Sequence, residues 1–288
     1  MLLKDLINIG TETVSQAFPE REAREMVFLY LGQRLGVSRH THILNPSYTV
    51  PEVEVSYARK AFARMAAGEP IQYIIGLAYF YGRDFIVTPD VLIPRPETEI
   101  LCREVIRWVE AFRRDLESTR IIDLCTGSGC IAWTLAMELP GTEVLAVDIS
   151  EAALDVAAGQ AFDRDGAKAP VFLKADVLAG MLPVPGLFDV IVSNPPYVME
   201  KEKSQMRRNV LDHEPHLALF VSDDDPLLFY RAVADSAKAL LKTGGLCLVE
   251  INEALGPETA DVFIVRGFSD VRVMKDLNDR DRFVYAIR

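Results

Sequence analysis

Apolar side chains in the first part of the chain recur at intervals of three and four residues, the spacing of one face of an α-helix. Three such groups begin at Leu2, Met26 and Tyr57. Pro19 precedes the second group, and the glutamates that follow it favour the positive end of a helix dipole. The pattern therefore predicts a small helical domain over residues 1–76.

Residues 77–99 have a different pattern, in which short apolar runs alternate with turn-forming residues. We expect residues 79–82 and 84–87 to pair as a hairpin. The segment 91–99 contains two prolines between apolar flanks and leads into an amphipathic helix that is predicted to end near Asp115. These features are typical of a shaped connector rather than a flexible linker.

From Arg120 onward, short apolar runs alternate with helical patterns. The runs lie at residues 120–124, 143–148, 170–173, 187–193, 245–251, 270–275 and 282–288. The helical patterns lie near residues 129–139, 151–163, 226–241 and 254–265. This alternation is typical of an α/β fold with a mostly parallel sheet wrapped by helices. Only six residues join the last two runs, too few for a crossover helix, so the last strand should be antiparallel.

Composition and charge narrow the class of protein. The chain of 288 residues is 50% hydrophobic and 25% charged, which is typical of a globular protein and excludes a disordered or collagen-like chain. The net charge of −11 lies entirely in residues 89–288, because the first 88 residues carry as many acidic as basic side chains. Proteins that bind duplex nucleic acid through its phosphates are usually basic, so this balance disfavours a nucleic-acid substrate.

The sequence also indicates where the protein is located in the cell and whether it binds a metal ion. It contains no run of about 20 apolar residues that would span a bilayer, and its first residues lack the features of a signal peptide. The four cysteines show no C-x-x-C pairing, and His213 and His216 have no third ligand at a useful spacing. We therefore expect a cytoplasmic protein with reduced thiols, no membrane association and no metal site.

A glycine-rich loop follows the first predicted strand and opens a helix. Gly127 and Gly129 would let a ligand approach the backbone, and the helix N-terminus would supply free amide donors. Asp148 ends the next predicted strand, where a carboxylate would accept hydrogen bonds from ribose hydroxyls. The pattern indicates a nucleoside cofactor; the competing interpretation is a glycine turn with an unrelated acid.

Two further acids refine this prediction. Asp123 lies at the end of the first strand, where its charge would repel a pyrophosphate but suit a cationic ligand such as a sulfonium with an α-amino group. Asp176 follows the third strand, with Val177 after it. This pair suits adenine, since the carboxylate accepts from the exocyclic amine and the apolar side chain covers one face. Alternatively, Asp176 is a solvated loop acid.

The segment Asn194-Pro195-Pro196-Tyr197 ends a buried apolar run. Two consecutive prolines remove two backbone donors and leave the loop little conformational freedom. The Asn194 side-chain oxygen and the Pro195 carbonyl are then two acceptors, with an aromatic ring two residues further on. This arrangement fits a planar NH₂ group, held by the two acceptors and packed on Tyr197; the alternative is a rigid proline turn.

These two motifs together resemble the class I S-adenosylmethionine-dependent methyltransferases that act on amide or exocyclic amino nitrogen. Residues 68–76 (GEPIQYIIG), 92–99 (LIPRPETE) and 214–219 (EPHLAL) make the resemblance more specific. They are similar to segments of the peptide chain release factor glutamine methyltransferases, the PrmC/HemK family. One departure is Cys125, where many members have glycine.

The resemblance implies a Rossmann-like sheet and methyl transfer from S-adenosyl-L-methionine to the glutamine amide in the Gly-Gly-Gln motif of peptide chain release factors. Together with the changes in sequence pattern, it predicts a helical substrate-recognition domain (1–76), a hairpin and connector (77–99) and a methyltransferase domain (100–288). We also expect the protein to be a monomer. The implied cofactor-binding residues are Cys125, Thr126, Gly127, Ser128, Gly129, Asp148, Val177 and Asn194. The implied glutamine-binding residues are Asn194, Pro195, Pro196 and Tyr197, of which Asn194, Pro195 and Tyr197 are the predicted catalytic group.

Three charged residues have two interpretations each. Arg95 and Glu97 either frame the glutamine pocket or serve the structure, with Arg95 paired to a carboxylate. Glu214 either orients a loop over the site or has no such role.

Three competing functions are consistent with parts of the sequence. An adenine-specific DNA or RNA methyltransferase uses the same Asn-Pro-Pro-Tyr logic on a flipped base, although the acidic charge disfavours it. A nicotinamide-dependent dehydrogenase explains the glycines and Asp148 but gives residues 194–197 no role. A non-catalytic module that binds a partner through the helical domain does not need the Asn-Pro-Pro-Tyr loop.

Overall fold

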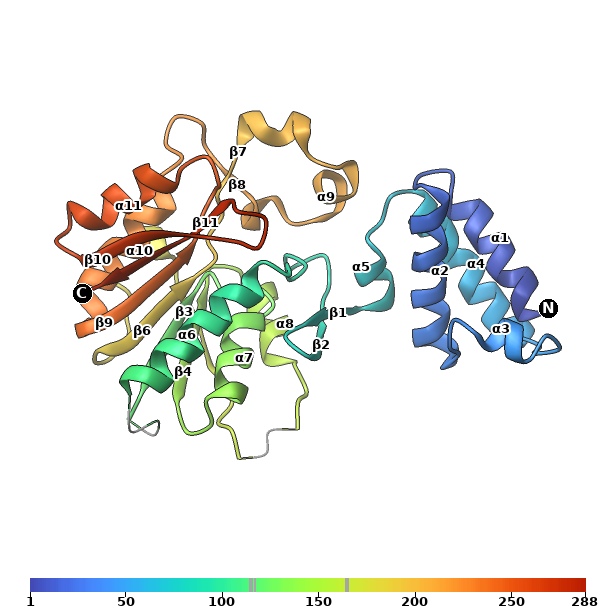
Figure 1. Ribbon diagram of the computed structural model, residues 1–288, viewed down its shortest axis with the longest axis horizontal. Helices are drawn as coiled ribbons and strands as arrows, with labels where there is room; N and C mark the ends of the chain where they lie inside the picture. Colours follow the sequence, from blue (N-terminus) through green and yellow to red (C-terminus); the bar gives the residue numbers. More distant parts are fainter. Residues whose placement is uncertain (114–115, 117, 164–165) are drawn as a thin grey trace. The chain divides into compact units, whose positions relative to one another are not determined.

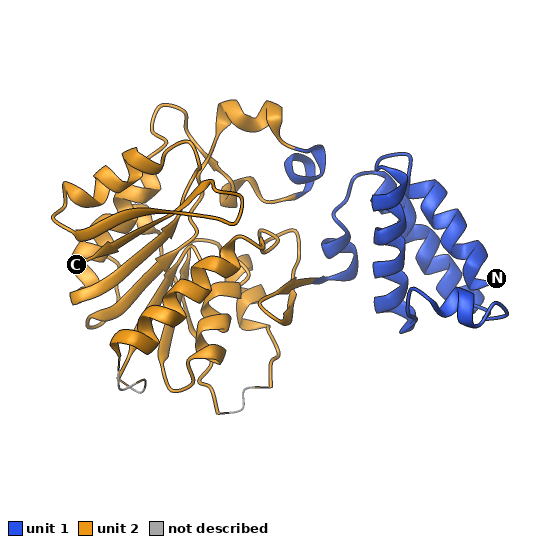
Figure 2. Cartoon of the chain, in the orientation of Figure 1, with its two compact units in different colours: residues 1–77, 207–213 blue, residues 78–206, 214–288 orange. Residues whose placement is uncertain are grey.

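The computed structural model describes residues 1–113, 116, 118–163 and 166–288. Within these ranges the chain forms two compact units (Figure 2). The first contains Met1–Leu77 and Arg207–His213, and the second contains Ala78–Met206 and Glu214–Arg288. Each unit has a hydrophobic core of its own. Among the described residues, none of the helices combines the length and the apolar character needed to cross a membrane.

The first unit is helical, as its sequence pattern predicts. Its helices are α1 (Leu3–Val14), α2 (Glu20–Leu35), α3 (Thr41–Leu44), α4 (Glu52–Ala66), α5 (Ile71–Ile75) and α9 (Arg208–His213). Pro19 and Pro51 precede α2 and α4, and each is followed by two glutamates in the first helical turn. Those charges lie at the end where the helix dipole is positive, which stabilises both N-termini.

The core of the first unit forms where α1 packs on α2 and α4. Leu6, Val14, Val27 and Phe62 are fully buried there. A Cβ atom on Gly10 of α1 would lie 2.7 Å from carbons of the Phe62 ring, so the absent side chain lets α1 approach α4 closely.

The predicted hairpin is confirmed as a two-stranded sheet of β1 (Leu77–Phe80) and β2 (Arg83–Ile86). The buried side chain of Gln160 fixes β2 within the second unit. Its Oε1 accepts from the Ile86 N–H at 2.8 Å, and its Nε2 donates to the Ile86 carbonyl at 2.9 Å. The same Nε2 lies 3.2 Å from the Ser128 carbonyl, so one side chain joins the hairpin to the glycine-rich loop.

The second unit is built on a seven-stranded sheet of order β10-β11-β9-β6-β3-β4-β5 (Figure 1). Its strands are β3 (Arg120–Leu124), β4 (Glu143–Asp148), β5 (Val171–Lys174), β6 (Phe188–Ser193), β9 (Leu241–Glu250), β10 (Ser269–Lys275) and β11 (Asp281–Ile287). The five strands from β9 to β5 are parallel, and β11 is antiparallel to both β9 and β10. The predicted mostly parallel sheet with an antiparallel last strand is therefore confirmed.

Helices cover both faces of this sheet (Figure 1). They are α6 (Thr98–Phe112), α7 (Cys130–Glu138), α8 (Glu151–Ala158), α10 (Leu228–Leu240) and α11 (Gly256–Ile264). Neighbouring residues of one strand face opposite sides. Ile121 of β3 packs with α6 and α7, whereas Ile122 packs with α10 and α11. Burial on both faces explains why β3 and β6 read as continuous apolar runs rather than as alternating ones.

Some predicted boundaries were wrong by a few residues. The helix expected to reach residue 163 ends at Ala158, because Gly159 follows it and Gln160 turns to bond the hairpin. The strand expected from residue 245 begins at Leu241, since the pair Gly244-Gly245 resembles a turn but continues as β9. The end of the helix predicted near Asp115 lies outside the described residues; α6 ends at Phe112.

Shorter elements connect the main ones in the second unit. They are η1 (Val177–Ala179), β7 (Val198–Met199), η2 (Glu200–Gln205), η3 (His216–Ala218) and β8 (Phe220–Val221), with β7 and β8 paired in parallel. The sheet reverses its winding at β3, because β4 lies on one side of it and β6 on the other. Ligands of open α/β sheets bind at the carboxyl ends of the strands at such a reversal.

The buried Gln160 amide gives a testable prediction about stability. Gln160→Ala leaves the Ile86 N–H and two carbonyls without their partner, so the free energy of unfolding should fall by about 1–3 kcal/mol. Urea denaturation measures the change. Asp163→Ala, at an exposed position three residues later, is the control and should leave stability within about 0.5 kcal/mol. Equal stability of both variants would contradict the proposed role of Gln160.

Candidate active site

A cavity of about 330 Å³ opens in the second unit at the carboxyl ends of β3, β4 and β6. Residues at or just after the ends of these strands line it, among them Gly127, Asp148 and Asn194. Connector residues 89–92, 94 and 95 form another part of the wall, with Thr98 at the start of α6. The volume is in the range of pockets that bind small molecules and cofactors.

Most of the predicted site residues line this cavity. Those that do are Arg95, Cys125, Thr126, Gly127, Ser128, Asp148, Asp176, Val177, Asn194 and Pro196. Those that do not are Glu97, Asp123, Gly129, Pro195 and Tyr197. The structure thus brings together residues from five segments of the chain, and the second group is not part of the lining.

The two glycines of the loop have different physical roles. Both have positive φ, 54° at Gly127 and 78° at Gly129, which disfavours other residues. A Cβ atom at Gly127 would meet nothing within 4 Å, so this position leaves open space for a ligand against the backbone. A Cβ atom at Gly129 would lie 3.0 Å from that of Ala157, so this glycine allows α7 and α8 to pack closely.

Asp148 is held firmly at the end of β4. Its Oδ2 accepts from the Gly127 N–H and its Oδ1 from the Ser150 N–H, both at 2.9 Å. Burial raises its pKa, and these backbone bonds oppose the rise. Backbone hydrogen bonds from Gly127, Ser150 and Ile149 leave the carboxylate capacity for a further one, so the side chain can still accept from a hydroxyl of a ligand in the cavity.

Asp123 is fully buried behind the glycine-rich loop. Its Oδ2 accepts from the Thr126 hydroxyl at 2.6 Å, whereas its Oδ1 has no hydrogen-bond partner among the described residues. Burial raises its pKa to about 7, and the nearby Asp148 charge adds to the rise. A cation bound in the cavity would lower this pKa, because it would stabilise the carboxylate.

Asp176 and Val177 form the cavity wall after β5. The Asp176 side chain accepts from the Leu178 N–H at 2.8 Å and caps η1. Val177 is buried and belongs to the core that supports this wall. The carboxylate and the apolar side chain therefore lie at the same wall, as their predicted contact with an adenine ring requires.

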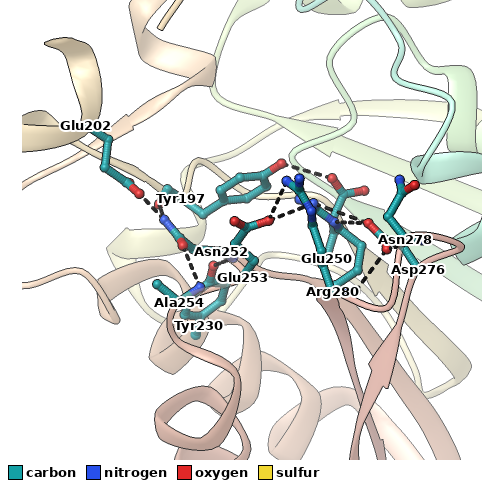
Figure 3. A network of polar contacts seen from close by, with 11 residues as sticks. Tyr197, Glu202, Tyr230, Glu250, Asn252, Glu253, Ala254, Asp276, Asn278 and Arg280 are labelled. Carbon is teal, nitrogen blue, oxygen red and sulfur yellow. Dashed lines mark hydrogen bonds and ion pairs between the residues drawn. The ribbon is translucent and has the colours of Figure 1, made fainter. Parts of the chain in front are cut away.

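The Asn-Pro-Pro-Tyr loop is fixed by hydrogen bonds at both of its ends. The Ser193 hydroxyl donates to the Leu124 carbonyl at 2.7 Å, which joins the end of β6 to that of β3. Asn194 Nδ2 donates to the Thr98 hydroxyl at 3.2 Å. The Tyr197 hydroxyl donates to Glu250 at 3.0 Å, so this ring points away from the cavity lining and into a polar network (Figure 3).

Thr98 and Glu250 are site residues that the sequence reasoning missed. Glu250 ends β9, is fully buried, and accepts from the Thr98 hydroxyl at 2.7 Å. Burial raises its pKa, while the bonds from Thr98 and Tyr197 and the charge of Arg282 oppose the rise. A signal was present, because a carboxylate that ends an apolar strand is the same pattern that drew attention to Asp148.

Arg95 pairs with Glu214, as one of its two interpretations proposed. Arg95 Nη2 lies 2.7 Å from Glu214 Oε1, and the other carboxylate oxygen accepts from the Ile93 N–H at 3.1 Å. The Glu214 side chain is buried, whereas Arg95 also lines the cavity. Glu214 thus fixes the connector where it forms the cavity wall. Among the described residues, no group of three His, Cys, Asp or Glu side chains is arranged to hold a metal ion.

Two protein families match this chain, one in its N-terminal helical part and one in its methyltransferase part. The PrmC N-terminal domain family matches residues 5–76, and the Methyltransferase small domain family matches residues 108–217. The release factor glutamine methyltransferase of Bacteroides thetaiotaomicron is 38% identical over 277 residues, which are 96% of this chain and 97% of that protein. The chain belongs to the release factor glutamine methyltransferase family.

Two other members of the family are similar over nearly the whole chain, and one solved structure is similar at lower identity. The enzyme of Flavobacterium psychrophilum is 35% identical and covers 99% of this chain and 98% of its own length. That of Bacillus subtilis is 34% identical and covers 95% and 93%. Among solved structures, a methyltransferase of Pyrococcus furiosus is 18% identical, covers 72% of this chain and 90% of that one, and has a TM-score of 0.49.

The methyl donor of this family is S-adenosyl-L-methionine, and the cavity fits it. The open space at Gly127 and the acceptor oxygens of Asp148 suit a nucleoside. The Asp123 carboxyl does not line the cavity, but it is bonded to the lining residue Thr126, and its negative charge when ionised suits a cationic tail. Cys125 has a φ of 62°, a conformation that glycine adopts readily. The small cysteine is accommodated in this backbone at a modest conformational cost.

The raised pKa of Asp123 predicts a pH-dependent affinity. Below pH 7 the carboxyl is increasingly protonated, so binding of the cationic cofactor should require loss of its proton. The Kd for S-adenosylmethionine should therefore fall as pH rises from 5.5 to 7.5, by at most about tenfold per unit. Isothermal titration calorimetry measures it.

Two controls separate this effect from other titrations. Asp123→Asn removes the carboxyl but keeps Asp148. It should therefore flatten the pH dependence of the Kd if Asp123 is the group that titrates. S-adenosylhomocysteine lacks the sulfonium charge and should show a weaker dependence in the unmodified protein. The same slope in Asp123→Asn as in the unmodified protein would assign the titration to another group.

Proposed function

We propose that this chain transfers the methyl group of S-adenosyl-L-methionine to the side-chain amide nitrogen of the glutamine in the Gly-Gly-Gln motif of peptide chain release factors. The observation that carries the proposal is the position of Asn194. Its side chain lines the cavity beside the glycine-rich loop, and its Nδ2 is already bonded to Thr98. The free branch of the amide is an acceptor, which suits the N–H of a substrate amide.

The chemistry explains why an acceptor is needed at this place. An amide nitrogen is a poor nucleophile, because its lone pair is delocalised into the carbonyl group. The sulfonium cofactor supplies an activated methyl group when it is bound. Asn194 Oδ1 and the Pro195 carbonyl would hold the two hydrogens of the glutamine NH₂ group, so that the nitrogen lone pair is directed at that methyl. Such positioning can contribute about 7–11 kcal/mol toward the barrier in favourable cases.

The remaining predicted roles complete the proposal. Gly127, Asp148, Asp176 and Val177 bind the cofactor, and the nitrogen releases its proton to water after transfer, since no side chain is assigned as a general base. Pro196 lines the cavity and limits its width. Residues 1–76 recognise the release factor, and the enzyme acts as a monomer in the cytoplasm.

A substrate panel tests the function directly. The chain is incubated with methyl-labelled S-adenosylmethionine and, separately, a release factor, its Gly-Gly-Gln variant with Gln→Ala, and DNA. We expect label on the release factor alone and none on the variant. Label on DNA alone would instead support an adenine methyltransferase, and label on the Gln→Ala variant would show a different target residue.

Substitution of Asn194 tests the mechanism. Asn194→Ala removes an acceptor from the reacting nitrogen and should lower kcat about 100-fold or more, since misplacement of reacting groups has effects of this size. The Kd of S-adenosylmethionine should change by less than about threefold, because glycine-loop and carboxylate contacts remain. Asn278→Ala, in the exposed turn between β10 and β11, is the matched control. A near-normal kcat for Asn194→Ala would refute the assigned role.

A further inference from the structure

The mechanism above requires that Asn194 present its oxygen, not its NH₂ group, to the substrate. The two branches of an asparagine amide have nearly the same shape, so packing alone does not distinguish them. Hydrogen-bond polarity does. The structure contains a series of hydrogen-bonded side chains that sets this polarity. It begins at Glu250, which is not itself a lining residue of the cavity.

The chain of bonds runs in one direction. A carboxylate accepts hydrogen bonds and donates none, so the Thr98 hydroxyl, 2.7 Å from Glu250 Oε2, must give it its only hydrogen. The Thr98 oxygen can then only accept from Asn194. The group 3.2 Å away is accordingly Nδ2, and Oδ1 is left on the other branch.

Contacts around Glu250 oppose the rise in its pKa that burial causes. Tyr197 donates to its second oxygen at 3.0 Å, so both carboxylate oxygens accept from a hydroxyl. The positive charge of Arg282 also acts on this carboxylate, while Glu97 opposes it. Hydrogen bonds to an ionised group are the stronger kind, which suits a buried side chain that orients others.

The same strand end holds Tyr197 from a second direction (Figure 3). Asn252 Nδ2 donates to the Tyr197 carbonyl at 3.1 Å and to Glu202 at 2.8 Å. The Asn252 backbone N–H donates to the Tyr230 hydroxyl at 2.9 Å. The loop is therefore bonded at its first residue through Thr98 and at its last through Glu250 and Asn252, so its position follows that of β9.

We propose that Glu250 is a positioning residue which, through Thr98, directs Asn194 Oδ1 toward the substrate amide. If Glu250 were replaced by a group that can donate, Thr98 could reverse its hydroxyl and the Asn194 amide could turn over. Its NH₂ group would then face the NH₂ group of the glutamine, and two donors cannot bond each other. This inference rests on the proposed function.

Kinetics of matched variants test the proposal. Thr98→Val and Glu250→Gln should each lower kcat about tenfold or more, whereas the KM for the release factor and the Kd for the cofactor change less than about threefold. Thr98→Ser keeps the hydroxyl and should retain kcat within about threefold. The double variant Thr98→Val/Glu250→Gln should be no slower than the slower single variant, because both act through one chain of bonds.

A second measurement does not depend on methyl transfer. The chain has six asparagines, so selective ¹⁵N labelling of their side-chain amides gives few NMR signals, and Asn194→Ala identifies the relevant pair. Thr98→Val should shift this NH₂ signal and speed its exchange with solvent, and Thr98→Ser should not. Circular dichroism of each variant checks that it folds. If Glu250→Gln does not fold, the comparison of Thr98→Val with Thr98→Ser is sufficient to test the proposal.

The outcomes separate the two proposals. If the unmodified protein methylates no release factor, the proposed function is refuted. The NMR experiment still tests the hydrogen bond between Thr98 and Asn194 in that case, because it does not depend on methyl transfer. Thr98→Val with normal kcat, or with an unchanged Asn194 signal, overturns the role of the Glu250–Thr98 chain. Equal losses in Thr98→Val and Thr98→Ser overturn it as well, since they would indicate packing rather than hydrogen-bond polarity.

Discussion

The parallel pairing of β3 with β6 is the constraint on which the rest of the site depends. It places Leu124 opposite Ser193, although 69 residues separate them, and the Ser193 hydroxyl reinforces the pairing at the strand ends. The glycine-rich loop and the Asn-Pro-Pro-Tyr loop follow these two residues directly, so they emerge side by side. Since parallel neighbours need crossover connections, the same arrangement covers both faces with helices, and the cavity opens at this edge of the sheet.

Buried carboxylates then hold the segments around that edge. Asp148 accepts from two backbone N–H groups of loops, Glu214 from the connector, and Glu250 from two hydroxyls. Burying a charge is costly unless it is hydrogen-bonded, so each segment must keep its position for these acids to be satisfied. Asp123 differs, because one of its oxygens lacks a partner among the described residues and its pKa is raised to about 7.

Local patterns in the sequence were sufficient to predict most of the fold. Runs of apolar residues identified all seven strands of the large sheet. In β3 and β6 the reason is burial on both faces, whereas no residue of β5 or β10 is buried. The short loop before the last strand predicted its antiparallel direction. The predicted boundaries of helices and strands were wrong where a glycine can either end an element or lie within one. Gly159 ends a helix, whereas Gly244 and Gly245 lie within a strand, and the sequence alone does not distinguish the two cases.

The sequence by itself determined the residue types of the site: the glycines with positive φ, the acids that end strands, and the rigid Asn-Pro-Pro-Tyr segment. These are local properties, since φ preference and strand burial depend on neighbours in the chain. Only the tertiary structure decided which groups bond each other. Thr98 and Glu250 are 152 residues apart, and Gln160 bonds a hairpin 74 residues before it. Such partners become neighbours only when the order of strands in the sheet is established. The orientation of the Asn194 amide therefore cannot be predicted from the spacing of residues in the sequence.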